Sequence, residues 1–357
     1  MSHLIISKKN EVFLQVKAEP HVYYELADQF TFDVPGAKFM PQYRNKYWDG
    51  KIRLFNTQTG EIYVGLLDKL TKFCDDHEYT YEFVNNKFYG LPFEVNDFIS
   101  KEGVKDYMNA ICKYSPREYQ VEGVYDALRH NRKLLISPTA SGKSLMIYSI
   151  VRYYVEKGQN TLIVVPTTSL VEQMYKDFED YGWDVGSFCH KIYAGKERET
   201  DSQVIITTWQ SIYKLPRKYF SRFNVVVGDE AHQFKSKSLI SIMGKLSDAK
   251  YRFGFTGTLD GTQTHKWVLE GLFGPSYKII RTEELMKKGH VFGAKSPPLY
   301  PHFQLDLAFC ASMSFQNSIP SEVVLIAPPA FLSIPNIVSP EDPYLESFTL
   351  PSFSMSG

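Results

Sequence analysis

Five short apolar segments alternate with helix-length segments between about residues 115 and 275. They read KLLIS, TLIVVPT, QVIITTW, FNVVVGDE and YRFGFTG. Strands that are hydrophobic along their whole length are typical of parallel sheets, because helices cover both faces of such sheets. The alternation therefore predicts an α/β domain built on a parallel sheet with helices on both faces. Ligands bind beyond the carboxyl ends of such strands, so the polar residues that follow each apolar segment are the candidate site residues.

The first of these segments leads into a loop that is typical of phosphate binding. Residues 134–145 read LLISPTASGKSL, which places Lys143 and Ser144 at the expected start of a helix. Backbone N–H groups and the positive end of the helix dipole attract an anion at such a turn. Lys143 is expected to reach the β- and γ-phosphates of ATP, and the Ser144 hydroxyl to bind Mg²⁺. Ser137 replaces the first glycine of the usual pattern, and a strand–turn–helix corner with an exposed lysine is the alternative.

Two adjacent carboxylates, Asp229 and Glu230, end the apolar segment FNVVVGDE. Burying unpaired charge is costly, so packing alone explains such a pair poorly. In P-loop enzymes the acid at the strand end organises Mg²⁺, and a neighbouring glutamate can polarise the attacking water. A solvated acidic turn is the alternative. The hydroxyls of Thr256 and Thr258 follow the next segment and are expected to relay the state of the nucleotide.

A helix is predicted upstream of the loop, because Ser115 and Pro116 form a start signal. Arg117 and Gln120 lie three residues apart on one side of that helix. A glutamine amide can donate to and accept from an adenine edge, whereas an arginine can face a phosphate or a carboxylate. An ordinary capped helix is the alternative.

The first 100 residues predict a small α+β domain. Their patterns indicate strands over residues 11–18 and 80–84 and helices over residues 21–30 and 68–78. A further helical segment is predicted over residues 95–111.

The stretch from Phe32 to Asn56 interleaves basic and aromatic residues. Asp49-Gly50 predicts a two-residue hairpin turn within it. Cations that meet phosphates and rings that stack on bases suit a nucleic acid. A hairpin with its rings in the core and its cations in solvent is the alternative. The candidate contacts are Lys38, Arg44, Lys46, Tyr47, Trp48, Lys51 and Arg53.

Net charge, cysteine content and the length of apolar runs restrict the class of protein. The formal net charge is zero, but residues 1–292 hold 39 basic and 35 acidic residues, a net charge of +4 that gives slight support to a polyanionic partner. The four cysteines show no metal-binding spacing and are expected to be reduced thiols. Neither a signal peptide nor a membrane-length apolar run is present, so we expect a cytoplasmic protein.

Six motifs in this order resemble those of superfamily 2 helicases of the DEAH-box kind. They are Arg117 with Gln120, SPTASGKS, VVPTTSL, TTWQS, VVVGDEAH and GFTGT. The upstream WDGKIRL stretch extends the likeness to UvsW-type helicases of bacteriophages, up to about Val291. The resemblance implies a nucleic-acid-binding domain over residues 1–100 and a RecA-like motor domain over residues 101–291. It also implies ATP and Mg²⁺ as cofactors, DNA with branches or junctions as the partner, and the host cytoplasm as the location.

The resemblance also implies roles for individual residues. Arg117 and Gln120 match the adenine-sensing motif, Asp229 the Mg²⁺ ligand and Glu230 the catalytic base. The phosphate cradle matches Ser137, Pro138, Thr139, Ala140, Ser141 and Gly142, followed by Lys143 and Ser144. The coupling elements match His232, Thr256, Gly257 and Thr258. The strand-contacting motifs match Thr167, Thr168 and Trp209.

Residues 292–357 depart from the family pattern. They hold ten of the chain's 19 prolines and no arginine. The resemblance implies a second RecA-like domain whose arginines complete the ATP site, and these residues show no strand–helix alternation. We expect a truncated chain or a shifted reading frame, a disordered tail, and weak or absent ATP turnover by this chain alone. A divergent folded extension is the alternative.

Two other functions stay open. The same ATP motifs occur in the motor subunit of a restriction endonuclease, which would also need a nuclease centre. A non-catalytic DNA-binding fragment is the third possibility. The sequence does not define the oligomeric state.

Overall fold

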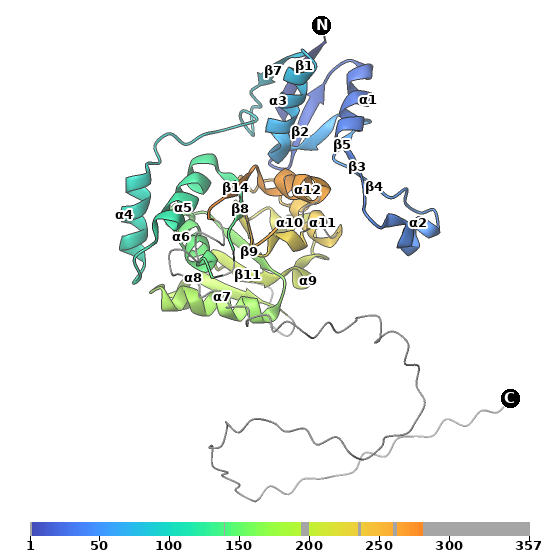
Figure 1. Cartoon of the computed structure of the whole chain (residues 1–357). Helices are drawn as coiled ribbons and strands as arrows, with labels where there is room; N and C mark the ends of the chain where they lie inside the picture. The colour runs from blue at the N-terminus through green and yellow to red at the C-terminus, as the bar shows by residue number, and fades with distance from the viewer. Residues whose placement is uncertain (1, 139, 194–199, 235–236, 260–262, 281–357) are drawn as a thin grey trace, which may run out of the picture. The chain divides into compact units, whose positions relative to one another are not determined.

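The computed structural model describes residues 2–138, 140–193, 200–234, 237–259 and 263–280 (Figure 1). All of them belong to one unit of the chain, residues 1–294. Within these ranges, no helix combines the length and the apolar character needed to cross a membrane. The predicted irregular tail lies outside the described residues, and its expected disorder stays a prediction.

The largest sheet of the described residues has seven strands, and all of them are parallel. The strand order is β10-β11-β9-β12-β13-β8-β14. The five predicted strands are β8 (Arg132–Ile136), β9 (Thr161–Val165), β11 (Val204–Thr208), β12 (Val225–Gly228) and β13 (Tyr251–Thr256). The sequence reading missed the two edge strands, β10 (Cys189–Ile192) and β14 (Ser276–Lys278), because both are short and carry polar residues.

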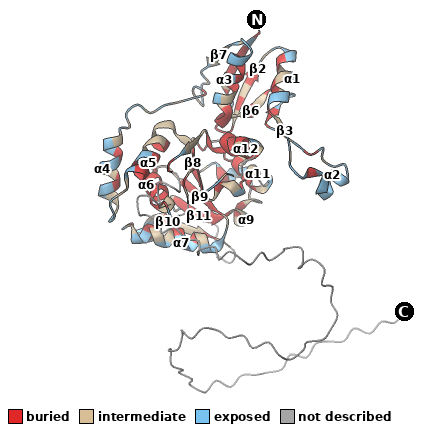
Figure 2. Cartoon of the chain, viewed as in Figure 1, coloured by how far each residue is buried: buried red, intermediate tan, exposed pale blue. Residues whose placement is uncertain are grey.

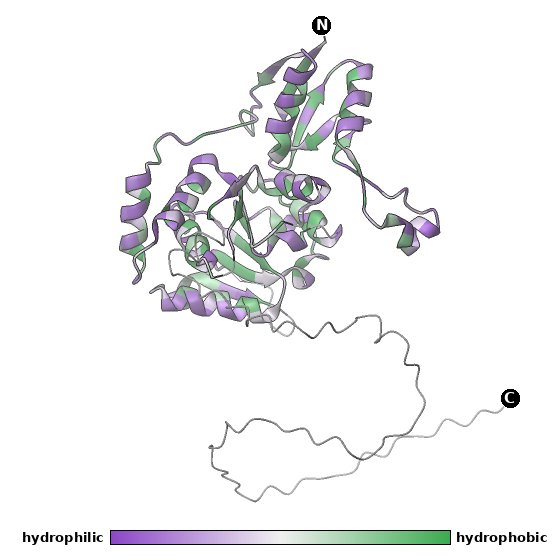
Figure 3. Cartoon of the chain, in the orientation of Figure 1, coloured by the Kyte–Doolittle hydropathy of each residue, from purple (hydrophilic) through white to green (hydrophobic). Residues whose placement is uncertain are grey.

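Helices cover both faces of this sheet, and two hydrophobic cores result. Neighbouring strand residues point to opposite faces, so Leu134 belongs to one core and Leu135 to the other. Figure 3 shows the hydrophobic strands between helices with hydrophilic outer surfaces. One face packs on α4 (Lys101–Ile111), α5 (Glu118–His130), α6 (Lys143–Val155) and α7 (Thr168–Asp180). The other packs on α9 (Trp209–Ile212), α10 (Arg217–Phe220), α11 (Lys237–Lys245) and α12 (Gln263–Phe273). The predicted α/β fold is confirmed.

The N-terminal residues form a separate five-stranded sheet with the order β5-β6-β2-β1-β7. Its strands are β1 (His3–Lys8), β2 (Phe13–Lys17), β5 (Phe55–Asn56), β6 (Glu61–Tyr63) and β7 (Thr80–Val84). Helices α1 (Pro20–Gln29) and α3 (Leu67–Asp76) and the turn η2 (Val64–Leu66) accompany it. The predicted small α+β domain is thus present, and its boundary near residue 100 stays a prediction.

The helix predicted over residues 95–111 begins later than expected, at Lys101. The Ser100 hydroxyl accepts a hydrogen bond from the Gly103 N–H at 3.1 Å, which caps the helix at that point. The residues before the cap are extended toward α5, since the Asn96 N–H donates to the Arg129 carbonyl at 2.7 Å.

The two-residue hairpin predicted at Asp49-Gly50 is wrong. Strand β3 (Thr31–Asp33) pairs with β4 (Lys51–Arg53), and an arm of intervening residues joins them. That arm contains the short helical segments η1 (Ala37–Phe39) and α2 (Pro41–Arg44). The residues before Asp49 form α2 and irregular structure instead of a strand, so Asp49-Gly50 does not join two strands. The Asp49 carboxylate accepts the Lys51 N–H at 3.2 Å and pairs with Arg53.

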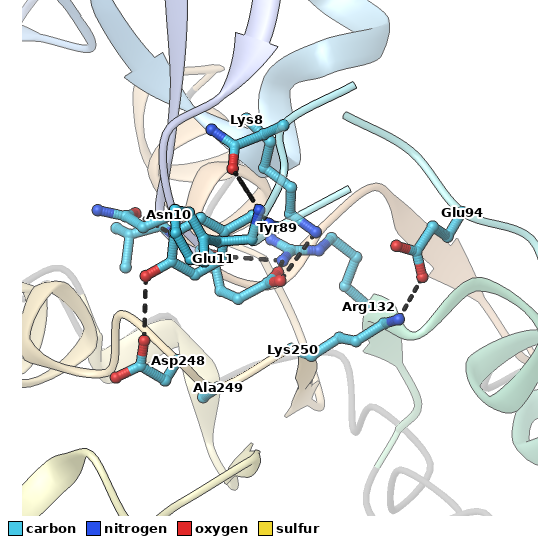
Figure 4. Close-up of polar contacts among 12 residues, drawn as sticks. Lys8, Asn10, Glu11, Tyr89, Glu94, Arg132, Asp248, Ala249 and Lys250 are labelled. Carbon is cyan, nitrogen blue, oxygen red and sulfur yellow. Dashed lines mark hydrogen bonds and ion pairs between the residues drawn. The ribbon is translucent and has the colours of Figure 1, made fainter. Parts of the chain in front are cut away.

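Charged residues from both sheets meet in a buried cluster (Figure 4). The Glu11 carboxylate lies 2.9 Å from Lys8 Nζ and 2.9 Å from Arg132 Nη2. All three side chains are mostly buried, and burial is the largest cause that lowers the pKa of Lys8 and of Arg132. The Tyr89 hydroxyl also donates to Asp248, and Lys250 pairs with Glu94. One carboxylate therefore balances two buried cations where the two sheets are joined.

Apolar packing joins the same two parts of the chain, and Figure 2 shows the buried strands and α12. The Trp267 ring of α12 lies 5.3 Å from Phe30 and 5.1 Å from Phe32, measured between ring centroids. Gly65 approaches α12 so closely that an added Cβ would lie 1.9 Å from the Glu270 carbonyl oxygen. The N-terminal sheet thus shares a core with the parallel sheet.

We predict that Glu11→Gln destabilises the chain by about 3–5 kcal/mol, because it leaves Lys8 and Arg132 buried without a countercharge. Chemical denaturation followed by circular dichroism measures the change. Glu82→Gln is the matched control, since Glu82 is half-exposed and pairs only loosely with His3, and its effect should stay within about 0.5 kcal/mol. Equal stability of Glu11→Gln and the parent would contradict the role of this cluster.

Candidate active site

The loop between β8 and α6 has the backbone shape of a phosphate-binding turn. Ala140 (φ 64°) and Gly142 (φ 77°) adopt left-handed conformations, and α6 begins at Lys143. Ser137 is fully buried, and its hydroxyl bonds to that of Ser141, so it fits where the family pattern has glycine. Thr139 lies outside the described residues. The residues predicted as the cradle thus form a strand–loop–helix corner, and their contact with phosphate stays a prediction.

Gln120 is hydrogen-bonded to this loop. Its side-chain amide donates to the Ser141 carbonyl at 2.9 Å, and its amide oxygen accepts from the Arg117 N–H at 2.8 Å. A Cβ on Gly142 would lie 2.3 Å from the Gln120 amide nitrogen, which explains the need for glycine there. Gln120 is thus engaged with backbone on both sides, and its predicted contact with adenine stays a prediction.

The two acids lie at the carboxyl end of β12. Asp229 is buried, and burial first, then the neighbouring Glu230 carboxylate, raise the pKa of Asp229 to about 6. The Glu230 carboxylate lies 3.2 Å from Lys143 Nζ. Lys143 and the acids therefore converge although 87 residues separate Lys143 from Glu230 in the sequence. A buried carboxylate beside a second acid is a suitable donor for a divalent cation.

A chain of polar contacts continues from Glu230 to the loop after β13. His232 Nδ1 lies 3.3 Å from Glu230 Oε2 and 3.3 Å from Thr256 Oγ1. The Thr256 hydroxyl donates to the Thr258 carbonyl at 2.8 Å, and the Thr256 carbonyl accepts from the Ser137 N–H at 2.8 Å. The structure thus brings His232 and Thr256 to Thr258 together with the phosphate-binding loop.

The Ser144 hydroxyl contacts a tyrosine in this structure. It lies 2.7 Å from the Tyr181 hydroxyl just beyond α7, and no hydrogen bond within the described ranges joins it to Asp229. Of the two predicted metal ligands, Asp229 faces the site and Ser144 contacts α7. The role of Ser144 in binding Mg²⁺ stays a prediction.

The predicted strand-contacting residues lie at the same edge of the sheet. Thr167 and Thr168 are exposed at the start of α7, and the Thr167 hydroxyl accepts the Leu170 N–H at 3.3 Å. Trp209 is half-buried at the start of α9, and it lines a small cavity together with Asp229. Trp209 therefore lies near Asp229.

The arm presents most of its predicted contacts to solvent. Trp48 is half-buried and its indole N–H donates to the Lys51 carbonyl at 2.8 Å, whereas Arg53 is exposed but pairs with Asp49. The exposed residues without an ion pair inside the described part of the chain are Lys38, Arg44, Lys46, Tyr47 and Lys51. The alternative that places the rings in the core holds for Phe55 but not for Tyr47.

Sequence reasoning missed two tyrosines at the site. The Tyr119 hydroxyl donates to the Ser141 carbonyl at 3.0 Å and accepts from the Arg117 guanidinium at 2.9 Å. Its position next to Gln120 in the sequence could have indicated that Tyr119 lies at the site. Tyr181 meets Ser144 from 37 residues away, and no local pattern marks it.

Comparison with known proteins identifies the family. A family model described as DNA helicase UvsW, N-terminal, matches residues 6–84, and one described as Type III restriction enzyme, res subunit, matches residues 113–261. A solved structure of the UvsW helicase from bacteriophage T4 has 30% sequence identity and a TM-score of 0.69, and the match covers 77% of this chain and 99% of that one. The chain belongs to the UvsW helicase family. The predicted resemblance is confirmed.

Other relatives agree with the UvsW assignment. The ATP-dependent DNA helicase uvsW of Enterobacteria phage T4 is 31% identical over 289 residues, which are 78% of this chain and 56% of that protein. The DNA 3'-5' translocase XPB2 of Sulfurisphaera tokodaii is 31% identical over 180 residues, 49% of this chain and 38% of that protein. The chain thus spans about half the length of the curated relatives that it matches.

We predict that Asp229→Asn stabilises this UvsW-family chain at neutral pH. The pKa of Asp229 is raised from 3.8 to about 6, so the folded state binds the extra proton between these values and parental stability falls as pH rises. The free-energy cost of the ionised Asp229 carboxylate is complete, at about 3 kcal/mol, above about pH 7, and it is small at about pH 4 and vanishes about one pH unit lower. Denaturation at pH 4 and pH 7.5 measures the difference. Asp180→Asn, at an exposed position, should show no such pH dependence, and an equal effect of Asp229→Asn at both pH values would contradict the assignment.

Proposed function

We propose that this chain carries the DNA-binding and first motor parts of an ATP-dependent DNA helicase or translocase that acts on branched DNA. The observation that carries the proposal is the meeting of Lys143 with Asp229 and Glu230 at the carboxyl ends of two strands of one parallel sheet. Family membership and the T4 relative named as an ATP-dependent DNA helicase support it.

In this proposal the loop binds the phosphates of ATP. Its N–H groups and the start of α6 attract the anion, and Lys143 exchanges its contact with Glu230 for a phosphate oxygen. Glu230 then becomes available to accept a proton from the attacking water. Asp229 and Ser144 would hold Mg²⁺, which neutralises phosphate charge when bound.

Arg117 and Gln120 are proposed to sense adenine. Gln120 supports this role because its amide is bonded to the Ser141 carbonyl inside the loop. A base that displaced the Gln120 amide would alter the loop directly, and one that displaced the Arg117 guanidinium would act through the Tyr119 hydroxyl. The polar chain through His232 and Thr256 is proposed to carry the state of the γ-phosphate toward bound DNA.

DNA is proposed to contact two regions. The arm supplies exposed cations, which suit phosphates, and the exposed hydroxyls of Thr167 and Thr168 with the half-buried Trp209 suit a strand that crosses the sheet edge.

Junctions of single and double strands are the proposed substrate class, and the host cytoplasm is the proposed location, in keeping with the phage relative.

A restriction-endonuclease motor is the second candidate, because the Type III restriction enzyme model matches residues 113–261. The match of the UvsW N-terminal model to residues 6–84 favours the helicase. The endonuclease would also need a nuclease centre, so strand cleavage of plasmid DNA in the presence of ATP and Mg²⁺ would support that candidate. An ATPase assay with and without branched DNA tests the third possibility, since a non-catalytic DNA-binding fragment would hydrolyse no ATP under either condition.

We predict that Lys143→Ala lowers the affinity for a fluorescent ATP analogue by roughly 10- to 100-fold, because a charge-assisted contact to phosphate is lost. Fluorescence titration with Mg²⁺ measures it. Lys176→Ala, at an exposed position on α7, is the control and should leave the affinity unchanged. Unchanged binding by Lys143→Ala would overturn the ATP site.

A further inference from the structure

The tip of the arm, residues 34–50, is a small folded unit on a two-stranded ribbon. The ladder between β3 and β4 extends to the tip, since the Val34 N–H donates to the Gly50 carbonyl at 2.8 Å. Inside the tip, Ala37 is buried, and a Cβ on Gly50 would lie 3.1 Å from the Tyr43 ring. The tip therefore packs on itself.

Two aromatic rings of the tip are left outside this packing. Phe39 is 77% exposed and Tyr47 is 86% exposed, and the neighbouring Met40 is 42% exposed. These are three of the eleven large hydrophobic residues exposed in the described part of the chain, and they lie within nine consecutive residues. Single exposed hydrophobic residues need no explanation, but a group of them does. A second group, five of the eleven, lies between residues 88 and 98, so the choice of the tip depends on the charge around its rings.

The charge around the rings selects a polyanion as the partner. Residues 31–56 hold five basic and two acidic residues, a net charge of +3. One acid, Asp49, is already paired with Arg53, whereas Lys38 and Lys46 beside the rings are exposed and form no ion pair within the described ranges. An acidic phosphodiester backbone meets these cations, and the π-faces of its bases suit the rings.

We propose that Phe39 and Tyr47 recognise the branch point of DNA by stacking on base pairs that end there. This inference rests on the proposed function, since it assigns the preference for branches to two side chains at the same DNA surface. Inside a linear duplex each base face is already covered, and inserting a ring would require unstacking a step. At a branch point the terminal base pairs have a free face, so a ring gains a stacking contact without that cost. Two rings on a convex tip fit such a point better than a continuous single strand, which needs a longer track of rings.

Binding to a fork, to a linear duplex of the same sequence and to single-stranded DNA tests this by fluorescence anisotropy with the full chain. Phe39→Ser with Tyr47→Ser should weaken fork binding by about tenfold for each ring, toward the affinity for the linear duplex, and change linear-duplex binding less than twofold. Lys38→Gln with Lys46→Gln should weaken fork and linear binding by the same factor. Tyr24→Ser is the matched control, because Tyr24 is 70% exposed on α1, outside the arm.

A second readout places the rings at the branch. A 2-aminopurine base beside the branch point should be quenched by the parent and by Tyr24→Ser, and much less by the ring variant. A ring variant that keeps the parental ratio of fork to linear affinity would overturn the inference, and so would an equal loss on single-stranded DNA. If the lysine variant also left every affinity unchanged, the arm would not be a DNA surface and that part of the proposed function would fail separately.

Discussion

The common direction of the seven strands is the constraint on which this structure depends. Parallel strands bring all their carboxyl ends to one edge, so residues far apart in the sequence become neighbours without any direct link. The hydrogen-bond ladder continues beyond the strands: the Ser137 N–H bonds to the Thr256 carbonyl at 2.8 Å, and the Asp229 N–H to the Val164 carbonyl at 3.1 Å. The first residue of each functional loop is thus held by the sheet, which fixes where Lys143 meets Glu230.

The N-terminal sheet is joined to the other end of the same strands. Arg132 begins β8 and bonds to Glu11, while the strand's last residue precedes the phosphate-binding loop. Shared apolar packing around Trp267 makes this junction a continuation of the core. A domain fixed in this way positions its arm relative to the motor sheet more firmly than a flexible linker would.

Much of this architecture could be predicted, for physical reasons that differ between elements. Strands buried on both faces are mostly apolar, so β8, β9, β11, β12 and β13 are recognisable in the sequence as five apolar segments, although β8 begins with Arg132 and β13 contains Arg252. The edge strand β14 is stabilised by pairing with β8 alone and reads only SYK, which no local pattern distinguishes from a loop. The prediction for the arm was wrong because Asp49-Gly50 has the composition of a tight turn, whereas the partner of β4 is β3, which lies before the helical segment α2.

The site, too, has residues that the sequence predicts and contacts that it does not. Lys143, Asp229 and Glu230 could be predicted to meet because each follows an apolar strand in a recognisable motif, and the structure brings them together. The contacts of Gln120 with Ser141 and of Ser144 with Tyr181 depend on how helices pack, which a sequence motif does not record.

Hydrogen–deuterium exchange with a slowly hydrolysed ATP analogue and Mg²⁺ tests most directly where the nucleotide binds. The structure predicts increased protection in peptides that cover residues 137–145 and 229–232, with the exposed arm unchanged. Protection confined to other segments, with these two peptides exchanging as in the free protein, would contradict the central claim.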